Sequence, residues 1–240
     1  MFIADIDNIE LDEVVTLERV NLTTPEKDEN SDNCKTYRFG EFPCNDFYQD
    51  KNSNGLEFWA PTKGFSSKST SRTRTEIREV TDRHAAYNWR YPDHAHHFLQ
   101  AALTVIQVPR ISQETVVGQI HVHGSTRPPL KLSWDKERIV VGFRQKFDQA
   151  NPVDTVLLTG VPLMSRWNYS IHVTKAGSVT IEVNSTVGSK TITFALDPNW
   201  KEQGLYFKAG VYNQEDPTDS TTMDEGSRAV FHKLSIRHQT

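Results

Sequence analysis

The residues best suited to chemistry stand in residues 206–214, which read YFKAGVYNQ. In an extended strand, alternate side chains point to opposite faces, so the polar members of this stretch share one face. They are Tyr206, Lys208, Tyr212 and Gln214. The other face is apolar, and Gly210 leaves room for something to approach the backbone. Two phenols, an ammonium and an amide on one face can bind an oxygen-rich anion and protonate it.

Two further stretches separate polar from apolar side chains in the same way. Residues 72–78 read RTRTEIR, and their polar face holds Arg72, Arg74, Glu76 and Arg78. Residues 119–123 read QIHVH and place Gln119 and His121 on one face. So many guanidinium groups on one face are unfavourable unless an anion or Glu76 compensates them. We therefore expect one sheet to direct these side chains at a single groove.

This set of groups suits β-elimination in a chain of uronic acids. The reaction must neutralise the sugar carboxylate, remove the proton on C5 and protonate the leaving oxygen on C4. Arg74 and Gln119 can hold the carboxylate while negative charge develops on it. Histidine titrates near neutral pH, so His121 can accept a proton, and the phenol of Tyr212 can donate one.

Hydrolysis is the rival chemistry. A glycoside hydrolase needs two carboxyl groups that flank the scissile bond. The three stretches offer only Glu76, and its place between arginines suits it to orient their side chains. The residues therefore favour elimination over hydrolysis.

The elements that position these residues read as strands. Alternating or β-branched runs separated by turn residues occupy 99–108, 115–123, 138–143, 167–173, 178–183, 190–194 and 229–236. Residues 24–33 and 64–71 are polar and read as loops. Many short strands predict an all-β sandwich or jelly roll. The 240 residues fit a single domain, with residues 1–18 as an acidic, peripheral lead-in.

Residues 74–78, 119–121 and 206–214 resemble the three signature motifs of the alginate lyases of polysaccharide lyase family 7, in the family's order. Residues 20–25 and 56–61 extend the likeness over nearly the whole chain. The resemblance implies a β-jelly roll of two curved antiparallel sheets with the substrate in the concave face. It also implies that the loop before the arginine strand lies near the groove.

The resemblance implies roles for single residues. The matching tyrosine, here Tyr212, is the acid and can also be the base, whereas His121 is the base when the C5 proton lies on the other side of the sugar. Arg74 and Gln119 neutralise the carboxylate. The remaining polar residues of the motifs are assigned to substrate binding or support: Arg72, Arg78, Lys208, Tyr206, Gln214 and Glu76. No metal or other cofactor is expected.

Composition limits the possible partners and locations. A formal net charge of −4 and a pI near 6.1 argue against general nucleic-acid binding. No run is long and apolar enough for a membrane span, and the first residues lack a signal-peptide pattern. We expect either a secreted or periplasmic protein whose leader is missing here, or a cytoplasmic one.

The cysteines and the remaining histidines and tryptophans receive structural interpretations. Cys34 and Cys44 could close a short disulfide or remain free thiols. No Cys/His spacing resembles a zinc site, and we interpret His94, His96 and His97 as a surface turn. The tryptophans assigned to core or rim packing are Trp134, Trp167 and Trp200.

The function that we expect is an endo-acting alginate lyase that acts as a monomer on an anionic polysaccharide. A lyase for another polyuronate such as glucuronan, and a non-catalytic module that binds acidic glycans, remain alternatives. Retention of both His121 and Tyr212 favours an enzyme, because a binding module needs no proton donor. In the resembling family, isoleucine at the position of Ile120 accompanies activity on guluronate-containing blocks, so we expect that preference.

Overall fold

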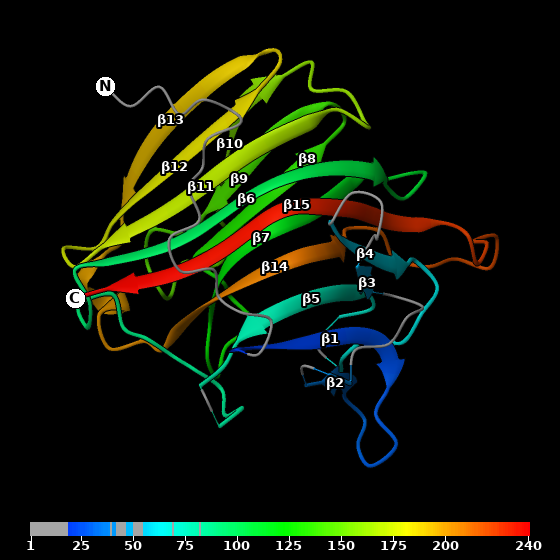
Figure 1. The fold of residues 1–240 in the computed structure, drawn as a ribbon, viewed down its shortest axis with the longest axis horizontal. Helices are drawn as coiled ribbons and strands as arrows, with labels where there is room; N and C mark the ends of the chain where they lie inside the picture. The colour runs from blue at the N-terminus through cyan, green and yellow to red at the C-terminus, as the bar shows by residue number, and fades with distance from the viewer. Residues whose placement is uncertain (1–18, 39, 42–46, 50–54, 69, 82) are drawn as a thin grey trace.

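Two antiparallel sheets lie one over the other around a hydrophobic core in this computed structural model (Figure 1). The structure describes residues 19–240 except 39, 42–46, 50–54, 69 and 82. The first sheet, here the groove sheet, has the strand order β10 (Val153–Thr159), β9 (Arg138–Phe143), β8 (Leu130–Asp135), β7 (Glu114–Val122), β14 (Leu205–Asn213), β5 (Arg74–Glu79), β1 (Val20–Lys27) and β2 (Cys34–Tyr37).

The second sheet, here the back sheet, has the order β13 (Gly188–Ala195), β12 (Ser178–Ser185), β11 (Arg166–Thr174), β6 (His96–Gln107), β15 (Gly226–Gln239), β4 (Leu56–Pro61) and β3 (Phe47–Gln49). A 3-10 turn at Pro198–Trp200 precedes β14, and the described residues contain no α-helix. The prediction of an all-β fold with two antiparallel sheets is confirmed.

Alternating sequence patterns direct apolar side chains into the space between the sheets. In β12 every second residue is buried, beginning with Val179, as expected for a strand with one face on a core. Trp134, Trp167 and Trp200 expose 2%, 1% and 0% of their surface, so the expectation that they pack in the core is confirmed. Burying each such side chain contributes roughly 2–3 kcal/mol before entropy is counted.

Strand β14 lies in the middle of the groove sheet and is buried on both faces. Its core face carries Phe207, Ala209 and Val211, all fully buried. Its other face is also nearly covered, because Tyr206 and Tyr212 expose only 8% and 7% of their surface. Side chains that are packed this tightly are held in one arrangement, which suits a catalytic strand.

Gly210 allows β5 to approach β14 closely. Its φ is +142°, and a Cβ at this position would lie 2.3 Å from the carbonyl oxygen of Thr75 and 2.8 Å from Cα of Glu76. The register with β7 also shifts between Ala209 and Tyr212. The room that the sequence indicates beside Gly210 is therefore filled by the backbone of the neighbouring strand.

A buried polar network fixes β14 from the core side. Oε1 of Glu79 accepts hydrogen bonds from the indole N–H of Trp89 at 2.6 Å and from the backbone N–H of Phe207 at 2.7 Å. Oε2 of Glu79 lies 2.7 Å from Nε2 of His238, whose Nδ1 lies 2.7 Å from Nδ1 of His97. The network joins both sheets, since Glu79 belongs to β5, His97 to β6 and His238 to β15.

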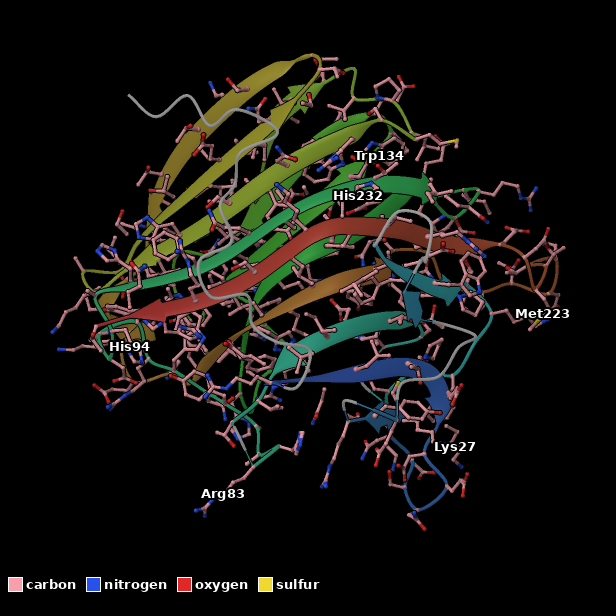
Figure 2. The ribbon with its side chains drawn as sticks, in the orientation of Figure 1. Lys27, Arg83, His94, Trp134, Met223 and His232 are labelled. Atoms are coloured by element: carbon pink, nitrogen blue, oxygen red, sulfur yellow. The ribbon has the colours of Figure 1, made fainter. Side chains whose placement is uncertain are left out.

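Two local predictions are wrong in part. His97 is fully buried in β6 and does not belong to a surface turn, because its ring stacks on Trp89 with centroids 4.1 Å apart. His94 lies at the end of the sandwich opposite Met223 (Figure 2). The loop predicted at residues 24–33 starts later, because β1 continues to Lys27 and Thr24 is fully buried.

Other predictions lie at or beyond the limits of the described chain. Cys34 carries a free thiol at the start of β2, and Cys44 lies outside the described residues. The predicted lead-in at residues 1–18 also lies outside them. Arg72 and Gln214 flank β5 and β14 and lie beyond the ends of these strands.

Candidate active site

The register of three strands assembles the predicted site residues. β14 pairs with β5 on one side and with β7 on the other. Tyr212 stands opposite Arg74, and Lys208 stands opposite Gln119 on the β7 side. Tyr206 in turn stands opposite His121. Residues far apart in sequence therefore meet on one face of the groove sheet, as the alternation predicts.

An open pocket of about 270 Å³ lies on that face. Strands contribute Arg74, Gln119, His121, Lys131, Tyr206, Lys208 and Tyr212 to its lining. Loops contribute Ser67, Thr70, Ser125, Thr126 and Pro128. The first two loop residues precede β5, as the resemblance implies, and the other three connect β7 to β8. The pocket combines three cationic side chains with a histidine and two phenols.

Glu76 is the buried centre of the site. Its side chain exposes 1% of its surface, and Oε2 lies 2.5 Å from Nζ of Lys208 and 3.6 Å from Nη1 of Arg74. Its other oxygen accepts a hydrogen bond from Nε2 of Gln119. Burial raises the pKa of the Glu76 carboxyl, but Lys208 and Arg74 together outweigh burial and hold this pKa below its ordinary value. The predicted role of orienting the neighbouring cation is consistent with these contacts.

The contacts of Glu76 also fix the site's hydrogen-bonding directions. Burial lowers the pKa of the Lys208 ammonium to about 8, although Glu76 opposes this shift. Glu76 requires the amide nitrogen of Gln119 to face it, because a carboxylate cannot donate a hydrogen bond. Oε1 of Gln119 is then buried without a donor among the described residues. A buried acceptor in a pocket lining is ready to bind a donor from a ligand.

His121 is a neutral imidazole in this environment. Burial, followed by the charge of Lys208, lowers the pKa of His121 to about 3. Nδ1 lies 2.9 Å from the hydroxyl oxygen of Tyr206 and 3.0 Å from the carbonyl oxygen of Val122. The backbone N–H of Val122 also lies 2.9 Å from Nδ1 and suits the tautomer that is protonated on Nε2. In the other tautomer Nδ1 donates its proton to one of the two oxygens, and Nε2 then keeps a lone pair that can act as a base.

Tyr212 lies among cations. The guanidinium carbon of Arg74 stands 4.0 Å from the centroid of its ring, and Nζ of Lys131 stands 5.0 Å from that centroid. Its hydroxyl oxygen lies 3.4 Å from Oγ1 of Thr70. Two cationic side chains of the pocket lining therefore flank this phenol.

Arg78 lies behind the pocket lining. Its guanidinium stacks on the ring of Tyr206, with the guanidinium carbon 3.6 Å from the centroid, and donates a hydrogen bond of 2.6 Å to Asn88. Burial lowers the pKa of Arg78. Arg78 thus supports Tyr206, the residue whose hydroxyl contacts His121. The predicted contact of Arg78 with substrate stays a prediction.

Arg72 and Gln214 stand beside the pocket and contact each other. Nη1 of Arg72 donates a hydrogen bond of 3.1 Å to Gln214, and Nε lies 3.4 Å from a carboxylate oxygen of Asp216. Neither residue lines the pocket. Their predicted substrate binding therefore stays a prediction, because the strand ends place them at the margin.

Sequence reasoning missed Lys131 and the loop residues of the lining. Residues 130–134 read LKLSW, and Lys131 lies on the polar face of this alternating segment. It stands opposite Gln119 in β7. The turn residues Pro128 and Pro129 indicate a hairpin between these strands, so this contact was readable from the sequence. Ser67 and Ser125 belong to polar loops that carry no distinguishing pattern.

The fold and this pocket together define a class of protein. A cationic pocket with a phenol and a neutral imidazole, on an antiparallel sandwich, is the arrangement expected of a polysaccharide lyase. Residues 15–238 match the family described as alginate lyase, and the chain belongs to this family. The prediction of a polysaccharide lyase that acts on alginate is confirmed at this level.

Solved structures support the assignment. Alginate lyase PA1167 from Pseudomonas aeruginosa is 30% identical, covers 93% of this chain and 100% of its own, and has a TM-score of 0.82. A variant of alginate lyase A1-II′, in complex with the product GGG, is 25% identical, covers 93% and 96%, and has a TM-score of 0.78. The alginate lyase from Klebsiella pneumoniae, 20% identical over 93% and 96% with a TM-score of 0.80, shares the fold. The predicted jelly roll of family 7 is confirmed.

The other comparisons are negative. No curated protein matches this sequence. Within the described ranges, no helical segment has the length and apolar character of a membrane span. Across the same residues, no three His, Cys, Asp or Glu side chains are grouped so that they could hold a metal ion.

Proposed function

We propose that this protein is an endo-acting alginate lyase that cleaves guluronate-containing blocks by β-elimination and leaves an unsaturated uronate end. The single observation that carries the proposal is the joint presence of Arg74, Gln119, His121 and Tyr212 in one pocket lining. These four residues supply every group that elimination needs. They also lie on adjacent strands of a rigid sheet, so their geometry requires no rearrangement.

The first task is to neutralise the uronate carboxylate. Arg74 keeps 15% of its side chain exposed, and its closest carboxylate, Glu76, is 3.6 Å away and shared with Lys208. Its guanidinium can therefore pair with a substrate carboxylate from the pocket side. Gln119 offers its second amide hydrogen to the carboxylate, and its unpartnered oxygen to a sugar hydroxyl. Charge that develops on the carboxylate during elimination is then held by preorganised donors.

The second task is to move two protons. Burial keeps the His121 ring neutral at neutral pH, and in the tautomer that is protonated on Nδ1 the lone pair of Nε2 can take the C5 proton. Tyr212 gives its proton to the C4 oxygen as the glycosidic bond breaks, and the electron pair of the C5–H bond becomes the C4–C5 double bond. The protons and electrons balance without a further reactant.

The geometry of the sugar links these roles to block preference. Guluronate and mannuronate are C5 epimers, so the C5 proton lies on opposite faces in the two sugars. In guluronate this proton and the C4 oxygen lie on opposite faces, and separate groups such as His121 and Tyr212 can serve them. Ile120 is fully buried in the core, so its side chain does not contact a sugar and marks the preference only as a family correlation.

Two observations support activity on guluronate and within chains. Variants of the relative A1-II′ have been solved in complex with the product GGG and with the substrate GGMG. In this chain, the pocket lies on the face of a sheet, between the loop before β5 and the loop after β7. A pocket on a sheet face can admit the interior of a polymer, which favours the endo mode.

Ultraviolet absorbance over time tests the proposal, since elimination creates a conjugated double bond and hydrolysis does not. Polyguluronate, polymannuronate and glucuronan are each incubated with the purified protein, and product lengths are followed by size-exclusion chromatography. We expect the fastest rise on polyguluronate, with mid-sized oligomers appearing first. Early release of only the shortest products would contradict the endo mode, and a rise on glucuronan alone would change the substrate. Binding without any rise would indicate a non-catalytic module.

A further inference from the structure

Lys131 belongs to the pocket lining, and the proposed reaction assigns it no role. It lies in β8, opposite Gln119 in β7, and its side chain lines the pocket. The other lysine of the pocket, Lys208, is ion-paired with Glu76 at 2.5 Å. Among the described residues, the ammonium of Lys131 has no ion pair or hydrogen bond. An ammonium held in a pocket without a carboxylate partner requires a functional reason.

Nζ of Lys131 lies 5.0 Å from the centroid of the Tyr212 ring. Arg74 approaches the same ring at 4.0 Å. The strand order β8-β7-β14-β5 places Lys131 and Arg74 on opposite sides of β14. The phenol of Tyr212 is therefore flanked by two cations, one of which has no competing partner.

The other charged groups around Lys131 come from three places. Glu76 and Arg74 belong to β5, and Arg72 precedes this strand. Glu114 in β7 accepts a hydrogen bond of 3.0 Å from Ser133, and burial raises the pKa of its carboxyl. Burial lowers the pKa of Lys131, while Tyr212 raises it.

We propose that Lys131 is a positioning residue that acts through Tyr212: its unpaired ammonium favours the phenolate form and thereby helps the phenol release its proton to the leaving oxygen. This inference rests on the proposed role of Tyr212 as the acid. A positive charge near the phenol stabilises the negative charge that forms when the proton leaves. Lys131 needs no contact with the sugar for this effect.

The test compares the pH dependence of kcat/KM for the wild type, Lys131→Met, Lys131→Gln and Lys131→Arg on the preferred polymer. Removing the cation raises the pKa of a neighbouring phenol, whichever proton-transfer role the phenol has. We expect the limb that depends on Tyr212 to move to higher pH by about one pH unit in both neutral variants. Lys131→Arg should restore the wild-type limb, because it retains the charge.

Lys35→Met is the matched control. Nζ of Lys35 lies 5.0 Å from the ring centroid of Tyr37, the same geometry, but neither residue lines the pocket. We expect the pH profile of Lys35→Met to match that of the wild type. Unchanged limbs in both neutral variants, with a raised KM and an unaltered kcat, would overturn the inference and make Lys131 a substrate-carboxylate contact.

A second readout does not depend on turnover. Near-ultraviolet absorbance reports tyrosinate formation during a pH titration, and the step that disappears in Tyr212→Phe belongs to Tyr212. We expect this step at higher pH in Lys131→Met than in the wild type, and an unmoved step would contradict the inference. If the wild type fails to act on any polymer, the proposed function fails, and this titration still decides the contact between Lys131 and Tyr212.

Discussion

Glu76 and Lys208 form an ion pair of 2.5 Å on neighbouring strands of the groove sheet, and their side chains expose only 1% and 8% of their surface. Removing two charges from water carries a large penalty, which an ion pair offsets only when further hydrogen bonds satisfy both groups. Gln119 and Arg74 complete the contacts of the carboxylate. The pair therefore positions the neighbouring side chains of the proposed site, and loss of either partner should destabilise the fold.

Glu76→Gln tests this relationship. The substitution leaves Lys208 and Arg74 buried without their carboxylate, so we expect unfolding free energy to fall by about 3 kcal/mol, measured by urea denaturation. Activity should fall as well, because a glutamine offers one acceptor oxygen where Gln119, Lys208 and Arg74 share the two oxygens of the carboxylate. The double variant Glu76→Gln with Lys208→Met should recover part of the lost stability. Equal stability of Glu76→Gln and the wild type would show that the pair does not stabilise the fold.

Tyr212→Phe separates proton donation from binding. The variant loses the hydroxyl but keeps the ring that Arg74 and Lys131 flank. We expect kcat to fall by at least about 1,000-fold while oligosaccharide affinity, measured by calorimetry, changes by less than about threefold. Tyr37→Phe is the control, since its hydroxyl contacts Glu26 and Tyr37 does not line the pocket. Full turnover by Tyr212→Phe would remove this phenol from the mechanism.

Gly210→Ala tests the close approach of β5 to β14. The added Cβ would lie 2.3 Å from the carbonyl oxygen of Thr75, and strands must separate to accept it. We expect a loss of more than about 2 kcal/mol of unfolding free energy, with activity reduced in the fraction that folds. Gly188→Ala is the control because its φ of +139° is nearly the same but nothing lies within 4 Å. Equal losses in both variants would assign the effect to φ alone.

The face of a strand on which each side chain lies was predictable, because it depends only on whether the residue number is odd or even. Tyr206, Lys208 and Tyr212 share one face in the structure, as expected from their even spacing. The neighbours of these residues were not readable from parity, since strand order is set by tertiary packing. Residues 130–134 were not predicted as a strand, and their alternation alone does not show that Lys131 stands beside Tyr212.

The sequence pattern also did not predict where the strands end or which polar residues form buried networks. Arg72 shares the parity of Arg74, but β5 begins at Arg74, and Arg72 instead pairs with Asp216 at the margin. His97 follows a run of histidines and polar residues that suggests a surface turn. Its burial depends on partners supplied by other strands, such as His238, which lies 141 positions away in the sequence.

His97 gives the fold a measurable response to acid. Burial, with His238 and other neighbours, lowers the pKa of His97 to about 3 in the folded protein, below the ordinary value of 6.5. Between these two values the unfolded chain binds more protons, so the stability contributed by neutral His97 is complete above pH 6.5 and is lost as the pH falls toward 3. The unfolding free energy should therefore fall by up to about 1.4 kcal/mol per pH unit through this residue.

Urea denaturation of the wild type and His97→Gln at a series of pH values checks this prediction. Glutamine keeps hydrogen-bonding capacity but has no proton to gain, so the variant should lose stability less steeply as the pH falls from 6.5 toward 3. Its absolute stability will be lower, because the stack on Trp89 is lost, and only the slope is diagnostic. His123→Gln, at an exposed position, should keep the wild-type slope. Parallel curves for the wild type and His97→Gln would mean that His97 does not couple folding to protonation, and the acid response would then belong to other groups such as His121.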